Sequence, residues 1–158
     1  PSPQGDRLIR RHPPAAPREV FVSHAASDRR FVAKLVQALR AHGVRAWYSE
    51  AHIVGAQQWH DEIGRALARC DWFLLILSPA AVKSKWVKRE LLFALQDDRY
   101  LERIVPILRK PCDYLALSWT LGSFQWVDFT EDFETGLRAL LRVWGREPAP
   151  PWRAGKRP

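Results

Sequence analysis

The sequence has few cysteines and no long apolar stretch, and both shortages narrow the class of protein. Cys70 and Cys112 lie far apart, without His or Cys neighbours at the spacing of metal ligands. This arrangement favours two free thiols in a reducing compartment. No run of about 18 apolar residues is present to cross a bilayer, and the first residues lack the pattern of a secretory signal. We therefore expect a soluble protein of the cytoplasm without membrane contact.

The sequence also lacks the glycine motifs that bind phosphate and the histidine motifs that bind metal. The eight glycines are scattered and form neither GxGxxG nor GxxxxGK[ST], which argues against a phosphate-binding loop. The five histidines show no HExxH or paired spacing, so we expect no metal site. Neither cysteine has a base partner in sight, so neither is expected to act as a nucleophile. The sequence therefore predicts no metal and no bound cofactor.

The net charge of +8 is concentrated at the two ends of the chain. Residues 1–19 contribute +2 and residues 145–158 contribute +3, which leaves only +3 for the middle. That surplus is too small to predict direct nucleic-acid binding by the middle of the chain. Both ends are rich in proline, which is typical of linkers. We expect residues 1–17 and 145–158 to be proline-rich tails or linkers, the second one basic, around a domain over 18–144 taken from a longer protein.

Between the tails, short apolar runs alternate with amphipathic stretches, as in β-α units around a parallel sheet. The run from Trp72 to Leu77 predicts a central strand buried on both faces. The whole pattern predicts an α/β fold, a flavodoxin-like open five-stranded parallel sheet flanked by helices on both faces. Strands are expected at 20–22, 44–48, 72–77, 104–108 and 124–127, and helices between 27 and 43, around 59–67, at 86–96 and at 132–144, with a short helical or irregular piece at 114–117.

Single residues add local expectations. Ser27 is expected to cap the first helix, with Asp28 favourable to its dipole, and Gly43 to end it. Pro106 lacks the N–H that a strand ladder needs, which predicts that strand 104–108 lies near an edge or contains a bulge. Ligands of such open sheets bind at the carboxyl ends of the strands, where the strand order reverses. The functional site is expected there.

Four ordered segments carry the motifs of the chain. They are Phe21-Val22-Ser23-His24 with Ser27-Asp28, then Val44 to Glu50 followed by Gly55, then Leu77-Ser78-Pro79 with Ser84 to Leu91, and last Phe124-Gln125-Trp126. As an ordered set over about residues 18–144, they resemble the Toll/interleukin receptor (TIR) family, most closely its bacterial branch.

The second segment departs from the family pattern at two positions. The family usually has Asp where this chain has Ser49, and Pro where it has Val54. TIR domains use this loop for self-association, so the resemblance implies a self-association loop of altered detail. Its predicted residues are Ser49, Glu50, Ile53, Val54 and Gly55.

Enzymatic TIR domains cleave the nicotinamide–ribose bond of NAD with a glutamate four residues after an aromatic residue. The resemblance implies this catalytic role for Glu90, which follows Trp86 at that spacing. Residues i and i+4 share a helix face, so both side chains would open on one cleft. A single carboxylate can suffice, because nicotinamide leaves a cationic pyridinium as a neutral molecule and needs no second acid. The fixed anion would stabilise the oxocarbenium-like charge.

The resemblance further implies that Trp86, His24 and Ser23 contact the substrate. Other interpretations of the same residues stay open. Glu90 could be a solvated helix glutamate paired with neighbouring cations, and Trp86 could belong to the core. His24 could be a capped or solvated side chain, and Ser23 a local cap at the strand end.

As a function, the resemblance implies an NAD-consuming effector of bacterial antiphage defence, with NAD+ as substrate rather than cofactor. The products would be nicotinamide with ADP-ribose or a cyclic ADP-ribose. Association with other TIR domains would activate it, and a sensor domain in the full-length chain or complex would trigger that association. Two alternatives remain, a non-catalytic TIR adaptor and a TIR mimic directed at a host.

Overall fold

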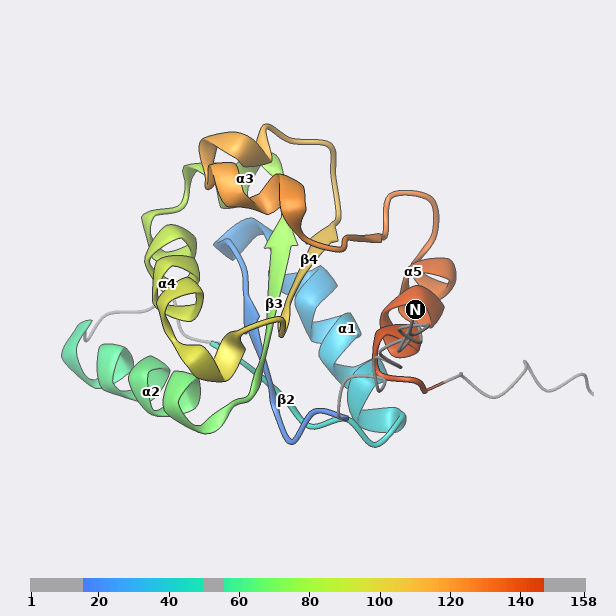
Figure 1. Ribbon diagram of the computed structural model, residues 1–158, viewed down its shortest axis with the longest axis horizontal. Coiled ribbons are helices and arrows are strands. Elements are labelled where there is room, and N and C mark those ends of the chain that lie inside the picture. Colours follow the sequence, from blue (N-terminus) through green and yellow to red (C-terminus); the bar gives the residue numbers. More distant parts are fainter. Residues whose placement is uncertain (1–15, 50–55, 147–158) are drawn as a thin grey trace, which may run out of the picture.

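The apolar runs of the sequence pair into a five-stranded, all-parallel sheet in the computed structural model (Figure 1). The structure describes residues 16–49 and 56–146. The strand order is β2-β1-β3-β4-β5, so the direction of winding reverses between β1 and β3, as the predicted flavodoxin-like fold requires. The strands are β1 (Val20–Ser23), β2 (Ala46–Tyr48), β3 (Trp72–Leu77), β4 (Ile104–Leu108) and β5 (Val127–Asp128).

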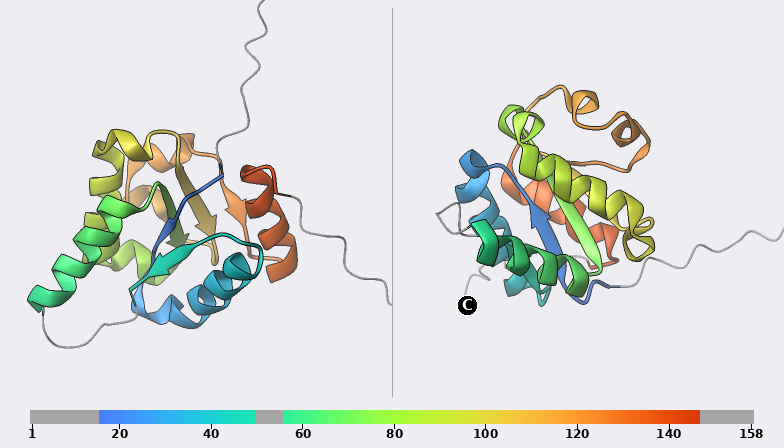
Figure 2. Two further views of the ribbon diagram at one scale, coloured as in Figure 1. Left: turned by 90° about the horizontal axis from the view of Figure 1, so that it is seen from below. Right: turned by 90° about the vertical axis from the view of Figure 1, so that its left-hand side faces the viewer.

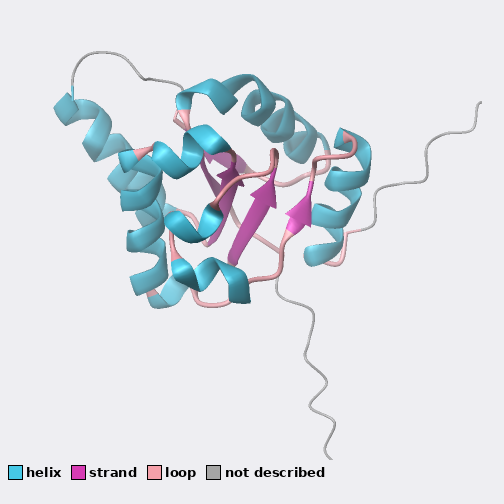
Figure 3. Ribbon diagram, turned by 90° about the horizontal axis from the view of Figure 1, so that it is seen from above, coloured by secondary structure: helices cyan, strands magenta, loops and turns pink. Residues whose placement is uncertain are grey.

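Helices cover both faces of this sheet (Figures 2 and 3). Helices α1 and α5 share one core with Val20 and Val22, while α2 and α4 share another with Phe21. Because neighbouring side chains of a strand point to opposite faces, β1 contributes to both cores. The helical elements are η1 (Ala26–Asp28), α1 (Arg29–Ala41), α2 (Ala56–Arg69), α3 (Pro79–Lys83), α4 (Lys85–Gln96), η2 (Asp98–Tyr100), η3 (Tyr114–Ala116), η4 (Trp119–Ser123) and α5 (Phe133–Val143).

Strand β3 is the centre of the domain, as its continuous apolar sequence predicts. All six side chains of Trp72–Leu77 are at most 1% exposed. They alternate between the two cores, with Trp72, Leu74 and Ile76 on the α1–α5 side. Burying each large aliphatic side chain contributes about 1.5–3 kcal/mol. This strand therefore anchors the helices of both faces.

The predicted strand at 124–127 is wrong for most of its length. Only Val127 and Asp128 pair with β4, whereas Phe124 closes the helical turn η4. The indole Nε1 of Trp126 donates a 3.0 Å hydrogen bond to the carbonyl oxygen of Leu121. The alternating aromatic residues resemble a strand, but both rings pack against the α2–α4 core from a loop.

Helix α3 is absent from the sequence-based expectation, which placed only a strand end at Ser78-Pro79. The Ser78 hydroxyl accepts a 3.1 Å hydrogen bond from the Ala81 N–H, and proline occupies the first helical turn. Proline suits this position because the N–H it lacks would have no partner within the helix. Ser-Pro therefore starts a helix here as well as ending a strand.

Of the three local expectations, Gly43 is confirmed. Helix α1 ends at Ala41, and Gly43 has a φ of +76°, which favours glycine. The predicted Ser27 cap is wrong, because α1 begins after Asp28 and no side chain caps it. Strand β4 lies near an edge, as predicted, because only the two-residue strand β5 follows it in the sheet. Strand β5 pairs with Ile107 and Leu108 and leaves Pro106 paired on one side.

The remaining expectations concern the ends of the chain and membranes. Most of the predicted proline-rich tails, residues 1–15 and 147–158, lies outside the described residues. None of the described helices combines the length and the apolar character that crossing a bilayer requires.

Two glycines in helices provide a matched test of core packing. A Cβ on Gly136 of α5 would lie 2.5 Å from the Phe129 ring, whereas a Cβ on Gly64 of α2 would meet no atom within 4 Å. We expect Gly136→Ala to lower the free energy of unfolding by about 1–3 kcal/mol, and Gly64→Ala to raise it by about 0.5–1 kcal/mol. Urea unfolding followed by circular dichroism measures both. Equal effects of the two substitutions would contradict this packing.

Candidate active site

Glu90 lies inside the protein at the carboxyl end of β1. Ser84 caps helix α4, because its hydroxyl accepts a 3.3 Å hydrogen bond from the Val87 N–H. The buried face of α4 consists of Val87, Glu90, Leu91 and Ala94, so the carboxyl occupies a position of the apolar stripe. Glu90 is only 9% exposed. The alternative of a solvated surface glutamate therefore does not hold.

Ser23 is the hydrogen-bond partner of this carboxyl. It is the last residue of β1, and its Oγ donates to Glu90 Oε1 at 3.3 Å. Burial raises the pKa of Glu90 to about 8, and the hydrogen bond from Ser23 opposes this shift only in part. No ion pair of the described residues includes Glu90. At neutral pH the carboxyl is therefore mainly protonated in this state of the protein.

The Trp86 side chain is half-buried and lies one helical turn before Glu90 in α4. The Arg89 guanidinium carbon lies 5.5 Å from the centre of the Trp86 ring, and the His60 ring of α2 lies 6.3 Å from it. The indole packs against the edge of the α2–α4 core. It thus belongs partly to the core and partly to the protein surface, and both interpretations of Trp86 describe a part of it.

His24 follows Ser23 at the same edge of the sheet but faces a different neighbour. It is 6% exposed, and its ring lies 5.9 Å from the Tyr48 ring at the end of β2 in an edge-on arrangement. Its Nδ1 also lies 3.5 Å from the carbonyl oxygen of Val22. The interpretation of His24 as a solvated side chain is wrong.

The predicted self-association loop follows β2 at this edge. Ser49 is half-buried after Tyr48. Glu50, Ile53, Val54 and Gly55 lie outside the described residues.

A buried polar cluster that sequence analysis missed joins three strand ends beside this site. Asp28, which is 2% exposed, accepts hydrogen bonds from Arg109 Nη1 and, at 2.5 Å, from Ser78 Oγ. Ser78 follows β3, Arg109 follows β4, and Asp28 ends the turn after β1. The Arg109 guanidinium also lies 5.1 Å from the centre of the Phe31 ring. The signal in the sequence was that Ser78 and Arg109 directly follow predicted strands, whereas Asp28 lies several residues beyond the first one.

The cysteines and possible metal ligands add no second reactive centre to the described part of the chain. Cys70 is buried, and burial raises the pKa of its thiol to about 12. Cys112 is partly exposed, and burial also raises its pKa. A thiol with a raised pKa is a poor nucleophile at neutral pH. No three His, Cys, Asp or Glu residues gather as a metal site within the described ranges.

Comparison with known families assigns the fold. The pattern of the TIR domain matches residues 20–141. This chain belongs to the TIR-domain family. Among solved structures, this TIR domain is similar to a metazoan TIR-STING receptor from C. gigas in complex with 2',3'-cGAMP, with a TM-score of 0.66 and 20% identity over 87% of this chain and 41% of that one. At that identity, the likeness concerns the fold alone.

Two curated relatives of this TIR domain are similar over a shorter stretch. The 2' cyclic ADP-D-ribose synthase BtTIR of Bacteroides thetaiotaomicron is 31% identical over 74 residues, 46% of this chain and 26% of the relative. The NAD(+) hydrolase TcpA of Theionarchaea archaeon (strain DG-70-1) is 30% identical over 74 residues, 46% of this chain and 22% of the relative. The match thus spans about a quarter of the length of these relatives.

The buried Glu90 predicts a pH dependence of stability. Its ordinary pKa is 4.5, whereas folded Glu90 has a pKa of about 8, so the folded state holds an additional proton between these values. The free energy of unfolding therefore falls as pH rises from about 4.5 to 8 and then levels off. We expect Glu90→Gln to remove this decline and to exceed the wild type by up to about 4 kcal/mol at pH 8.5.

Denaturant unfolding at several pH values measures this difference, and the exposed Glu131→Gln serves as the control that follows the wild type. A wild-type curve parallel to that of Glu90→Gln would show that Glu90 is not buried in solution.

The Asp28–Arg109 pair predicts a strong energetic coupling. Asp28→Ala leaves a partly buried guanidinium without its partner, and we expect a loss of about 3 kcal/mol in the free energy of unfolding. A double-mutant cycle with Arg109→Ala should give a coupling above about 1 kcal/mol. The pair between Glu19 and Arg69 is the control, because its arginine side chain is 51% exposed and we expect a coupling below about 1 kcal/mol. Additive effects at Asp28 and Arg109 would contradict the cluster.

Proposed function

We propose that this TIR domain cleaves the nicotinamide–ribose bond of NAD+ and that Glu90 is its catalytic carboxylate. The observation that carries the proposal is a buried carboxyl, hydrogen-bonded by Ser23, beside the reversal of strand order. Ligands of open α/β sheets bind at this place. The two curated relatives support the substrate, since their names describe an NAD(+) hydrolase and a cyclic ADP-D-ribose synthase.

The reaction requires one carboxylate and no second acid. The bond between ribose C1′ and the pyridinium nitrogen breaks, and its electron pair leaves with neutral nicotinamide. C1′ becomes an oxocarbenium-like cation, which anionic Glu90 stabilises. Attack by water, whose proton passes to solvent, gives ADP-ribose. Attack by a nucleophile within the substrate, such as the adenine, gives a cyclic product, and the proton released comes from that nucleophile.

The protonated state of Glu90 fits a resting enzyme that substrate ionises. A cationic pyridinium close to the carboxyl favours its charged form and lowers the pKa. Nicotinamide-bearing substrate thus helps to create the anion that its cleavage needs. A neutral analogue that lacks the pyridinium charge would not do so.

Access to Glu90 requires a change from the state described, because the side chain is 9% exposed. We infer that association with other TIR domains, through the loop that includes Ser49, opens the site. A sensor domain elsewhere in the full-length chain or complex would control this association, in bacterial antiphage defence. The solved TIR-STING receptor bound to 2',3'-cGAMP supports such a combination of a TIR domain with a ligand-binding part.

A non-catalytic adaptor is the second candidate, favoured by exposed apolar side chains. Trp119 is 84% exposed and Leu115 is 52% exposed on neighbouring turns η4 and η3. Such residues are enriched where proteins associate. An adaptor, however, gains nothing from a carboxyl in the apolar stripe of α4, which costs stability at neutral pH. The enzyme therefore accounts for more of the structure than the adaptor or a host-directed mimic does.

The test is nicotinamide release from NAD+, measured by chromatography with dilute protein and with protein forced to associate by fusion to an oligomer. We expect release under association and a loss of about 100-fold or more in Glu90→Gln. Glu131→Gln is the control and should retain full activity. Because Glu90→Gln is expected to be the more stable protein, lost activity will not reflect unfolding. Equal release from Glu90→Gln would place the catalyst elsewhere, and no release in either state would leave the adaptor.

A further inference from the structure

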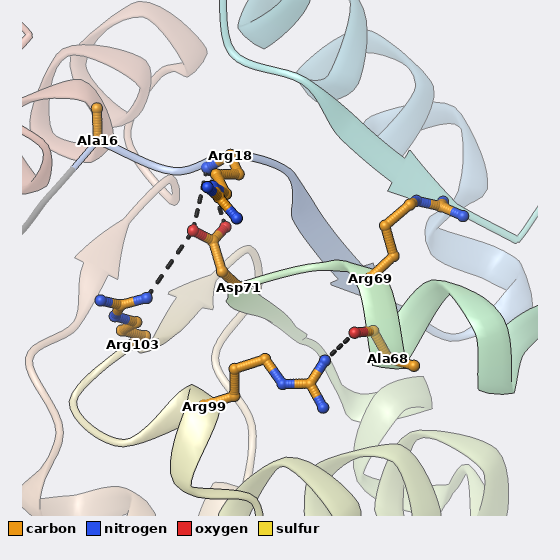
Figure 4. A pocket seen from close by; sticks show the side chains of 7 residues that line it. All are labelled: Ala16, Arg18, Ala68, Arg69, Asp71, Arg99 and Arg103. Atoms are coloured by element: carbon orange, nitrogen blue, oxygen red, sulfur yellow. Dashed lines mark hydrogen bonds and ion pairs between the residues drawn. The ribbon is translucent and has the colours of Figure 1, made fainter.

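An open pocket of about 450 Å³ lies near the amino ends of the strands (Figure 4). This is the edge of the sheet opposite the one that holds Ser23 and Glu90. The lining of the pocket comes from the segment that leads into β1, from the end of α2, from the turn η2, and from the residues directly before β3 and β4. The six residues of β3 separate the two edges by about 20 Å. Four arginines and one aspartate form the charged part of the lining, namely Arg18, Arg69, Arg99, Arg103 and Asp71.

The Asp71 carboxylate accepts hydrogen bonds from the backbone, and its single negative charge offsets only one of the four arginines of the pocket. The hydrogen bonds come from the N–H of Arg18 at 3.0 and 3.1 Å and from the N–H of Glu19 at 3.2 Å. These bonds fix the segment that leads into β1. The Arg103 guanidinium forms a long ion pair with Asp71 at 3.8 Å, beyond hydrogen-bond distance. Its N–H donors make no hydrogen bond to this carboxylate.

Two of the other arginines have structural roles at the end of α2. Arg69 forms a 2.6 Å ion pair with Glu19. Arg99 donates to the carbonyl oxygen of Ala68 and pairs with Asp97 at 3.3 Å. Cations at a helix carboxyl end stabilise its exposed carbonyl groups, which accounts for both side chains without a ligand.

Arg18 and Arg103 are held less closely, since Arg103 has only the long ion pair with Asp71. Among the described residues, the Arg18 guanidinium has no hydrogen bond or ion pair, and its backbone alone is held. The side chains of Arg18 and Arg103 lie on either side of the Asp71 carboxylate (Figure 4). One carboxylate offsets only one of these two positive charges, so the pair of guanidinium groups keeps a surplus that a further anion would offset.

We propose that this pocket binds a small molecule through a di- or polyphosphate group held by Arg18 and Arg103. The planar guanidinium offers paired donors that match phosphate oxygens. The volume lies within the range of small-molecule sites, about 300–1,000 Å³. The modest charge of the rest of the domain favours a compact anion over a nucleic-acid strand. The site is separate from the edge that holds Glu90, so its ligand is additional to the substrate.

Calorimetric titration with inorganic pyrophosphate at low salt tests this site. We expect saturable binding that Arg18→Gln and Arg103→Gln each weaken at least about tenfold, the loss of a charge-assisted hydrogen bond. Arg103→Lys keeps the charge without the paired donors and should weaken binding less than Arg103→Gln. Arg30→Gln, the same charge change on the opposite edge in α1, and Glu90→Gln should both bind as the wild type does.

Several results would overturn the proposal. They are the absence of saturable pyrophosphate binding, an equal loss in Arg30→Gln, and a loss in Glu90→Gln that points to the NAD site. A titration with a single-stranded oligonucleotide is the second arm. Tight oligonucleotide binding without pyrophosphate binding would show an extended nucleic-acid surface instead. Circular dichroism of each variant confirms folding, and Arg103→Lys provides a test even if Arg18→Gln unfolds.

Discussion

The parallel pairing of β1 with β3 is the constraint on which the rest of this domain depends. It sets Ser23 opposite Leu75 and joins the two halves of the sheet at the reversal of strand order. Because all strands run in one direction, the turns after β1, β3 and β4 meet at one edge, where Asp28 links them. The segments before the same strands meet at the other edge, where they line the arginine pocket together with the end of α2 and η2. One topology thus produces two chemically different ends.

Two buried carboxyl groups at the first edge, Asp28 and Glu90, differ in how their burial is compensated. Asp28 has a guanidinium and a hydroxyl as partners, so its position binds three strand ends together. Glu90 has a single hydroxyl partner and otherwise an apolar surrounding, which raises its pKa to about 8. A buried carboxylate with a charged partner and a hydrogen-bond donor stabilises the fold. A buried carboxyl with a strongly shifted pKa is instead typical of catalytic sites. The contrast explains why Glu90, rather than Asp28, is the proposed catalyst.

The sequence predicted those parts of the fold that rest on local periodicity. The apolar run of β3 and the amphipathic helices α1, α4 and α5 agree with expectation because burial follows their spacing. The strand expected around Phe124 failed because alternating aromatic residues also suit a loop packed on a core. The partners of Asp28 lie 50 and 81 positions away in the sequence. Local sequence patterns do not predict contacts over such separations. The spacing of Trp86 and Glu90 predicted a shared helix face, but the depth of Glu90 depends on how α4 packs.

The clamp of Asp71 on the backbone of Arg18 and Glu19 has a mechanical consequence. Strand β1 lies between β2 and β3, so tension on the chain just before it would act along the strand and load its ladder hydrogen bonds together rather than one by one. The carboxylate is the first contact to bear that load. These hydrogen bonds therefore resist a pull on Arg18 before it can displace Ser23, which bonds to Glu90 at the far end of β1.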